Sequence, residues 1–188
     1  MQTHDERKLV AEIKAGSREA FESFLHAYQD RVYGLVRRAV DVRDAEDVAQ
    51  EALIQIYRSI GGFQCRSGLS TWVYRVAMNV CLEHRRKKHP EMATFEDDCL
   101  ERPSSPDDDP SAVAVRSQVR SEIESAIASL PEIHRDVVVL HELQELTYQE
   151  CAEVLGCPVG TVKSRLSNAF AKLRVVLREY APESGLAK

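Results

Sequence analysis

Hydrophobic residues recur every three or four positions along most of this 188-residue chain. In AFESFLHAYQDRVYGLVRRAV, residues 20–40, one stripe consists of Phe21, Phe24, Leu25, Tyr28, Val32, Leu35 and Val36. This spacing follows the period of an α-helix with one apolar face. No alternating pattern long enough for an ordinary strand is present, and no internal repeat is visible. The pattern therefore predicts an all-α fold.

Two more helices follow in the first half of the chain. DAEDVAQEALIQIYRSIGGF, residues 44–63, repeats the apolar period and is expected to end at the glycine pair 61–62. LSTWVYRVAMNVCLEHRRKK, residues 69–88, has Ser70 as a plausible N-cap and ends in cations, which suit the negative end of a helix dipole. Its inward positions are expected to be Val73, Val76, Ala77 and Val80. In the second half, RDVVVLHEL is β-branched but keeps a helical period.

The stretch LTYQECAEVLGCPVGTVKSRLSNAFAKLR, residues 146–174, has the pattern of a helix-turn-helix. Thr147 and Glu150 have the spacing of a capping box, and Gly156 supplies a tight turn. Pro158 suits the start of the second helix. That helix should bury Val162, Leu166, Ala169, Phe170 and Leu173, and expose Lys163, Ser164, Ser167, Asn168 and Lys172. Residues 159–178 contain five cations and no acid, as binding to DNA phosphates requires.

Charge is distributed unevenly, although the formal net charge is −5. Residues 1–88 hold 15 basic and 12 acidic side chains, and residues 118–188 hold 8 and 10. Residues 89–117 hold only 2 basic against 8 acidic side chains and are rich in Pro, Asp and Ser. This composition is typical of a flexible acidic linker. We therefore expect a helical domain over 1–88, a linker over 89–117 and a helix-turn-helix domain over 118–188.

Two further patterns in the first domain suggest binding surfaces. Around residues 63–88, aromatic side chains alternate with cations and amides, as in grooves where unpaired bases stack. The alternative is that Trp72 and Tyr74 are core aromatics. The helix beginning at Asp44 groups Asp44, Asp47 and Glu51 near one face, beside Gln50, which is either a binding face or a solvated one.

Cysteines and chain termini give weaker indications. The five cysteines, at 65, 81, 99, 151 and 157, lack CxxC spacing, so we expect reduced, mostly buried thiols. Zinc bound by Cys151, Cys157 and a histidine is the alternative, and a redox role for Cys65, Cys81 or Cys151 is a further one. No catalytic pairing, phosphate loop or metal triad is visible, so we expect no enzyme activity, cofactor or metal. The absence of a signal sequence or membrane span predicts a cytoplasmic protein.

The sequence closely resembles the bacterial sigma-70 family of RNA polymerase sigma factors. LPEIHRDVVVLHELQELTYQECAEVLGCPVGTVKSRLSNAFAKLR is similar to the carboxyl-terminal, promoter-reading domain of that family. AFESFLHAYQDRVYGLVRR, DAEDVAQEALIQIYRSIGGF and LSTWVYRVAMNVCLEHRRKK resemble its amino-terminal domain. Two domains and a linker are the layout of the extracytoplasmic-function (ECF) subgroup. The resemblance implies a monomeric initiation factor for a stress- or signal-responsive set of genes.

The resemblance also implies roles for matching positions. Core polymerase, through its β′ clamp helices, would contact Asp47, Gln50 and Glu51, and its β flap would contact the second domain. The −10 promoter element would be bound by Gln64, Arg66, Ser67, Trp72, Arg75 and Asn79. The −35 element would be read by Lys163, Ser164, Ser167 and Asn168, with Thr161, Arg165 and Lys172 nearer phosphates. An anti-sigma factor, often membrane-bound in relatives, would hold the chain inactive.

Two other functions fit the residues alone. A stand-alone helix-turn-helix regulator would bind its site without polymerase, commonly as a dimer. A helical adaptor would bind another protein and never touch DNA. If the chain is a sigma factor, its two weak DNA-binding halves gain affinity for DNA once polymerase fixes the distance between them. The free chain, with its negative net charge, should bind DNA poorly until then.

Overall fold

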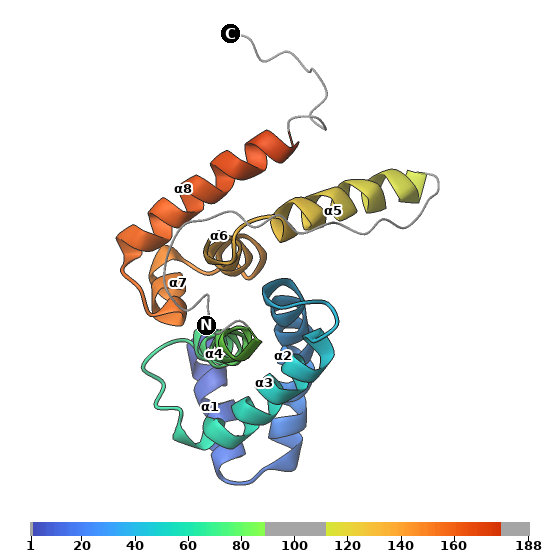
Figure 1. Cartoon of the computed structure of the whole chain (residues 1–188). Coiled ribbons are helices and arrows are strands. Elements are labelled where there is room, and N and C mark those ends of the chain that lie inside the picture. Colours follow the sequence, from blue (N-terminus) through green and yellow to red (C-terminus); the bar gives the residue numbers. More distant parts are fainter. Residues whose placement is uncertain (1, 89–111, 178–188) are drawn as a thin grey trace.

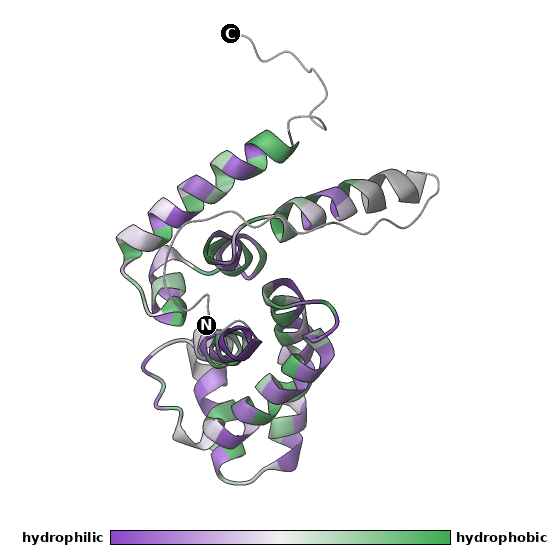
Figure 2. Cartoon of the chain, viewed as in Figure 1, coloured by the Kyte–Doolittle hydropathy of each residue, from purple (hydrophilic) through white to green (hydrophobic). Residues whose placement is uncertain are grey.

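The computed structural model describes residues 2–88 and 112–177, and their side chains from residue 5 to 88 and from 119 to 177. All regular structure in these two ranges is helical, as the periodicity predicts. Hydrophobic and hydrophilic positions alternate around the helices (Figure 2). None of the described helices combines the length and apolar character needed to span a bilayer.

Four α-helices and one short turn make up the amino-terminal part. They are α1 (Gln2–Lys14), α2 (Arg18–Ala39), α3 (Ala45–Ser59), the 3₁₀ turn η1 (Ile60–Gly62) and α4 (Leu69–Lys88). The Ser17 hydroxyl caps α2 by accepting a hydrogen bond from the N–H of Ala20 at 3.2 Å. The glycine pair follows α3 as expected. Helices α2, α3 and α4 pack pairwise around a shared core (Figure 1).

The predicted stripes are buried with few exceptions. Phe24, Tyr28, Val32, Leu35 and Val36 of α2 are buried, whereas Phe21 and Leu25 lie at its edge. In α4, Val73, Ala77 and Val80 are buried and Val76 is half-buried. The prediction of Ser70 as the N-cap of α4 is wrong. The helix begins at Leu69, two positions earlier than a Ser70 cap would give, because Trp72 N–H already donates to the Gly68 carbonyl at 3.1 Å.

The carboxyl-terminal part comprises α5 (Ala112–Ala128), α6 (Glu132–Val138), the π-helical turn η3 (Val139–Leu143), α7 (Tyr148–Leu155) and α8 (Val159–Val176). Helices α5 and α8 extend away from the amino-terminal helices (Figure 1). The linker was expected to reach residue 117, but α5 begins at Ala112, where AVAV replaces the Pro/Asp-rich composition. The rest of the expected linker, residues 89–111, lies outside the described residues, as do residues 178–188.

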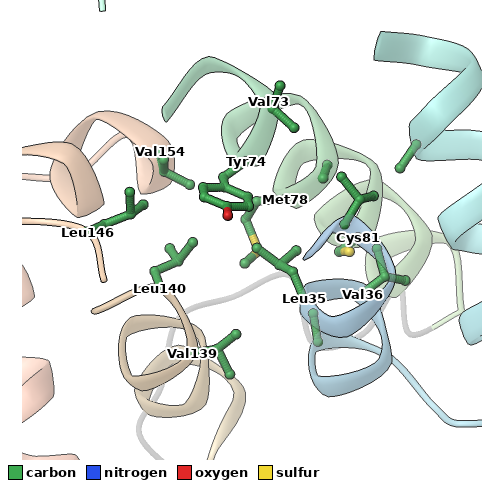
Figure 3. Close-up of a cluster of buried hydrophobic side chains, with 14 of the residues drawn as sticks. Leu35, Val36, Val73, Tyr74, Met78, Cys81, Val139, Leu140, Leu146 and Val154 are labelled. Carbon is green, nitrogen blue, oxygen red and sulfur yellow. The ribbon is translucent and has the colours of Figure 1, made fainter. Parts of the chain in front are cut away.

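The two parts meet along α4 and share one apolar cluster. Figure 3 shows Tyr74 and Met78 of α4 beside Leu35 of α2, facing Leu140, Leu146 and Val154 from the carboxyl-terminal part. Tyr74, Met78 and Leu140 are each at most 2% exposed. The helices before residue 89 and the helices after residue 111 are therefore packed against each other.

Candidate promoter and polymerase interfaces

The outer face of α3 presents the carboxylates expected to bind core polymerase. Asp47, Gln50 and Glu51 are all exposed, with Asp47 one turn before the other two, and they make no ion pair with other described residues. Sequence reasoning missed two neighbours on the next turns: Ile54 is 43% exposed and Tyr57 is 60% exposed. This helix thus presents a mixed acidic and apolar face, defined here as the α3 face by these five residues.

The loop before α4 borders a cavity of about 200 Å³. Its lining comprises Glu6, Arg7, Phe63, Cys65, Arg66, Ser67, Gly68 and Leu69. The first two belong to α1, which the motif-based prediction did not include. Lys14 Nζ donates to the Phe63 carbonyl at 2.6 Å and so fastens the start of the loop to α1. Cys65 adopts a left-handed backbone with φ of 53°, which is unusual outside glycine and turns the chain sharply here.

Residues predicted to bind the −10 element fall into two groups. Gln64, Arg66, Arg75 and Asn79 are exposed, with Arg75 and Asn79 one turn apart on α4, and Ser67 is half-buried at the cavity. Trp72 is only 7% exposed and packs on Phe63 with ring centroids 5.2 Å apart. In this arrangement the Trp72 ring is part of the core, and a base stacks on it only if its neighbours move.

The helix-turn-helix has the local geometry that its residues predict. Thr147 Oγ1 accepts from the N–H of Glu150 at 3.3 Å, and Glu150 accepts from the N–H of Thr147 at 2.9 Å, completing the capping box. Gly156 ends α7 in a left-handed conformation, with φ of 62°. Pro158 is the N-cap of α8, just before the first helical residue. This turn directs the start of α8 outward.

The exposed face of α8 contains the residues expected to contact DNA bases. Lys163, Ser164, Ser167 and Asn168 are exposed, while Thr161, Arg165 and Lys172 are half-buried. Beneath them Val162, Leu166, Ala169 and Leu173 are buried as predicted. Burial of Phe170 was predicted wrongly: it is 42% exposed, although its neighbours Ala169 and Leu173 are buried, so Phe170 lies at the flank of the buried face of α8.

Lys163 is oriented by an aromatic neighbour. Its Nζ lies 5.6 Å from the centroid of the Tyr148 ring, within cation–π range. The Tyr148 ring in turn packs on His141 at 4.6 Å, and His141 Nδ1 lies 2.6 Å from the Leu146 carbonyl. A side chain from the first helix of the motif thus supports a cation of the second.

The cysteines of the described residues are free thiols, and two of them are shielded. Burial raises the pKa of the Cys81 thiol to about 12 and that of the Cys151 thiol to about 12. Both groups are therefore protonated at neutral pH. No group of three or more His, Cys, Asp or Glu side chains is arranged for a metal among residues whose positions are described. Cys99 lies outside them.

Comparison with known proteins places both halves in one class. The family described as "Sigma-70 region 2" matches residues 24–90, and "Sigma-70, region 4" matches residues 120–173. These two regions cover the α2–α4 core with the loop before α4, and the helix-turn-helix, in the order described above. The class is that of sigma-70-type RNA polymerase sigma factors.

Full-length relatives narrow the class. The chain is 35% identical over 185 residues to "ECF RNA polymerase sigma factor SigW" of Bacillus subtilis, covering 92% of this chain and 97% of the relative. It is 34% identical over 172 residues to "RNA polymerase sigma-H factor" of Pseudomonas aeruginosa, covering 87% and 89%. The fold is also similar to that of sigma factor RpoE in complex with the anti-sigma factor NepR from Bartonella quintana. That likeness has a TM-score of 0.65 and 21% identity and covers 84% of this chain and 96% of that one. This chain belongs to the ECF group of RNA polymerase sigma factors.

Proposed function

We propose that the chain recruits core RNA polymerase to promoters through three separate surfaces, each carried by its own helix. The α3 face docks on the polymerase, α8 reads the −35 element, and the loop and exposed face of α4 hold the −10 element. The observation that carries this proposal is the outward face of α8, where four residues capable of base contacts are exposed beside a capped, glycine-terminated turn.

Docking through the α3 face is supported by its chemistry. Asp47, Gln50 and Glu51 are polar, exposed and free of internal ion pairs within the described chain, so binding a cationic partner disrupts no internal pair. Ile54 and Tyr57 add apolar area that a partner helix can cover. We assign this face to the β′ clamp helices.

Reading of the −35 element follows from major-groove geometry. A recognition helix contacts base edges with its amino-terminal half, which here contains Lys163, Ser164, Ser167 and Asn168. Thr161, Arg165 and Lys172 lie at the borders of this face, where they would contact the phosphates of the DNA backbone on either side of the groove.

Capture of an unpaired −10 base is assigned to the loop cavity. Arg66 and Ser67 line it, and Gln64 precedes them. Arg75 and Asn79 extend the surface along α4, where the displaced strand would run. Holding unpaired bases shifts the DNA toward its open form, because a ligand moves an equilibrium by its preference for one state. The chain's part is binding, and we assign it no catalysed reaction.

Other partners follow from the same assignment. Exposed apolar side chains on α5 and α8, Val119, Ile123, Phe170 and Val176, offer an area for the β flap. Relatives of this fold are bound by anti-sigma factors, as the RpoE–NepR structure is titled, and we propose such a partner here. The chain then acts in the cytoplasm, or at the inner membrane face when a membrane-bound anti-sigma factor holds it.

Reconstituted transcription with core polymerase and genomic DNA tests the function. The chain is expected to direct initiation at specific promoters. Asp47→Arg with Glu51→Arg should remove co-purification with the polymerase while circular dichroism stays unchanged. Lys163→Glu should instead keep polymerase binding and lose promoter selection.

Two outcomes would decide for the other candidate functions. Tight site-specific binding in a gel shift without polymerase would identify a stand-alone regulator. Retained function after charge reversal at both Lys163 and Lys172 would identify an adaptor that does not use DNA.

A further inference from the structure

Helix α1 forms one wall of the cavity of about 200 Å³ at the loop before α4. Glu6 and Arg7 of α1 line this cavity, and its other lining residues lie between positions 63 and 69. The two matched family regions begin at residues 24 and 120, so α1 lies outside both of them. The family match therefore assigns no role to these two side chains.

Contacts along α1 hold the helix against the loop. Lys14 Nζ donates to the Phe63 carbonyl at 2.6 Å, and Val10 is only 2% exposed in the core beneath. Glu6 lies one helical turn before Val10 on the same face of α1, and it is half-buried. Arg7, the next residue, is exposed. Glu6 therefore lies deeper in the cavity than Arg7, which lies at its mouth.

The cavity has an apolar floor and a polar edge. Phe63 and Leu69 are buried, while Glu6, Arg66 and Ser67 supply a carboxylate, a guanidinium and a hydroxyl. Proteins hold an unpaired base in this way, by packing on its flat face and forming hydrogen bonds to its pairing edge. At about 30 Å³ per water molecule the cavity has room for several waters, and the single ring of a pyrimidine fits it.

Glu6 is the acidic side chain among the lining residues, and its chemistry distinguishes the two pyrimidines. An ionised carboxylate accepts hydrogen bonds and donates none. Cytosine presents its N4 amino group as a donor, whereas thymine presents the O4 carbonyl, a second acceptor, at the same position. Arg66 and Ser67 can donate to the acceptors on the rest of the cytosine edge.

A carboxylate in a cavity that takes DNA lowers affinity unless it gains a hydrogen bond, because it adds negative charge beside the phosphates. Such a cost falls on a base without a donor and not on a base with one, and a cost of this kind is a source of specificity. The position of Glu6 therefore fits selection between bases better than it fits general attraction of DNA.

We propose that Glu6 selects cytosine as the unpaired −10 base in the loop cavity, and that Arg7 binds the phosphate beside it. This inference rests on the proposed function and names the base that the cavity takes. Glu6 accepts a hydrogen bond from the cytosine amino group, and thymine in its place leaves two acceptors opposed. Arg7 contacts the backbone, which carries no sequence information. The choice of base at this position thus depends on α1 as well as on the loop.

Labelling of Cys65 identifies the −10 position whose base enters the cavity. Cys65 is a free thiol that lines the cavity and is half-buried. The chain and core polymerase are bound to a promoter fork, in which the −35 element is duplex and the −10 strand is single. The base in the cavity should protect Cys65 from N-ethylmaleimide. An abasic nucleotide at that one position should restore the labelling, which peptide mass spectrometry measures.

Base exchange at that position tests Glu6. Forks with cytosine, uracil, adenine or guanine compete for the polymerase complex, and uracil has the ring of cytosine with a carbonyl in place of the amino group. The unsubstituted chain is expected to prefer cytosine over uracil by about tenfold or more. Glu6→Gln should remove most of this preference, because an amide both donates and accepts. Glu12→Gln, the same change at an exposed glutamate of α1, should keep it.

Arg7→Ala tests the phosphate contact. It should weaken binding of the cytosine and uracil forks by the same factor. It should also lower the slope of log affinity against log salt concentration by about 0.7, the contribution of one phosphate of single-stranded DNA. Lys8→Ala is the control, because it removes an exposed cation of α1 that does not line the cavity. Circular dichroism checks that each variant is folded.

The outcomes separate this inference from the proposed function. The inference is overturned if no abasic position restores Cys65 labelling, if uracil or a purine is preferred there, or if Glu6→Gln and Glu12→Gln show the same preference for cytosine. A cytosine-to-uracil ratio that changes in Arg7→Ala would overturn the phosphate contact. If polymerase with the unsubstituted chain binds no promoter fork, the proposed function fails and this inference fails with it, before any base is exchanged.

Discussion

Cys81 and Cys151 are held protonated by their surroundings. Each thiol has a pKa raised to about 12 by burial, and each side chain has no measurable exposure. Since the thiolate is the reactive form, both groups should be inert in the folded chain. We expect N-ethylmaleimide at neutral pH to leave them unmodified while labelling the half-exposed Cys65 and Cys157.

Peptide mass spectrometry after brief labelling measures this difference. A denatured sample provides the control, because all the thiols should react there. Rapid native labelling of Cys81 or Cys151 would show that the core around it opens readily, and would revive a redox role for that residue.

Glu150 gives the fold a pH-dependent contribution. Burial alone would raise the pKa of its carboxyl, but hydrogen bonds from the Thr147 N–H and the Thr147 and Thr71 hydroxyls outweigh it and lower the pKa from 4.5. A carboxyl whose pKa is lower in the folded chain than in the unfolded chain stabilises the fold at pH values above its ordinary pKa. This stabilisation is lost as the pH falls through the lower value.

The Glu150→Gln variant checks this linkage. It should be less stable than the starting protein at neutral pH, and the difference should shrink below pH 4.5. Urea unfolding at several pH values measures it. A difference that stays constant over this range would mean that the charge of Glu150 contributes nothing.

Burial could be predicted from the sequence for some residues and not for others. Apolar spacing identified Val32, Leu35 and Val162 as core because burial of a helix face is a local property of the chain. Apolar spacing also placed Phe170 inside, since spacing alone does not show how wide a stripe of the helix its neighbours cover. Arg85 stood among three other cations, and nothing near it in sequence shows that Asp136, far along the chain, neutralises it.

At the scale of elements, the turn between α7 and α8 fixes how the recognition helix is presented. Gly156 has φ of 62°, and a Cβ there would meet no atom within 4 Å. Glycine is therefore favoured at this position by its left-handed backbone conformation and not by lack of space. We expect Gly156→Ala to lower the free energy of unfolding by about 1 kcal/mol, and Gly156→Asn by less, since Asn tolerates the left-handed region.

A matched control lies in the next helix. Gly160 also has open space around it but a helical backbone. Gly160→Ala should therefore raise the free energy of unfolding, by about 0.5–1 kcal/mol. Thermal and urea unfolding compare the two. Equal effects of alanine at both positions would contradict the role given to the Gly156 conformation.

Elements were predictable to the extent that their signals are local. The capping box, the glycine turn and the basic helix all lie within residues 147–174, and each has the geometry expected of it. The amino-terminal helix α1 was not predicted to line the cavity at the loop before α4. Its Glu6 and Arg7 reach the cavity through packing between segments about 60 residues apart.

For the whole molecule, phosphate contacts make promoter binding depend on salt. Each cation that neutralises a phosphate adds about 0.9 to the slope of log affinity against log salt concentration. Lys163→Ala and Lys172→Ala, each tested as the polymerase complex on promoter DNA, should lower this slope by about that amount. Arg18→Ala, which breaks an exposed ion pair on α2, should leave it unchanged.

Fluorescence anisotropy at several salt concentrations gives the slopes. An unchanged slope for both lysine variants would remove them from the DNA interface.

The arrangement of the whole molecule was less predictable from the sequence than its residues or its helices. Two domains follow from composition and motifs, but their contact depends on Tyr74, Met78 and Asp136, whose partners no periodicity reveals.

The stacking of Lys163 on Tyr148 has a consequence for how a promoter is chosen. A lysine free in water gives up as much as about 2 kcal/mol of rotamer freedom when a ligand immobilises it. Here part of that loss has already occurred before DNA arrives. With the base contact that we propose for Lys163, Tyr148 of α7 would influence the discrimination between base sequences without touching any of them.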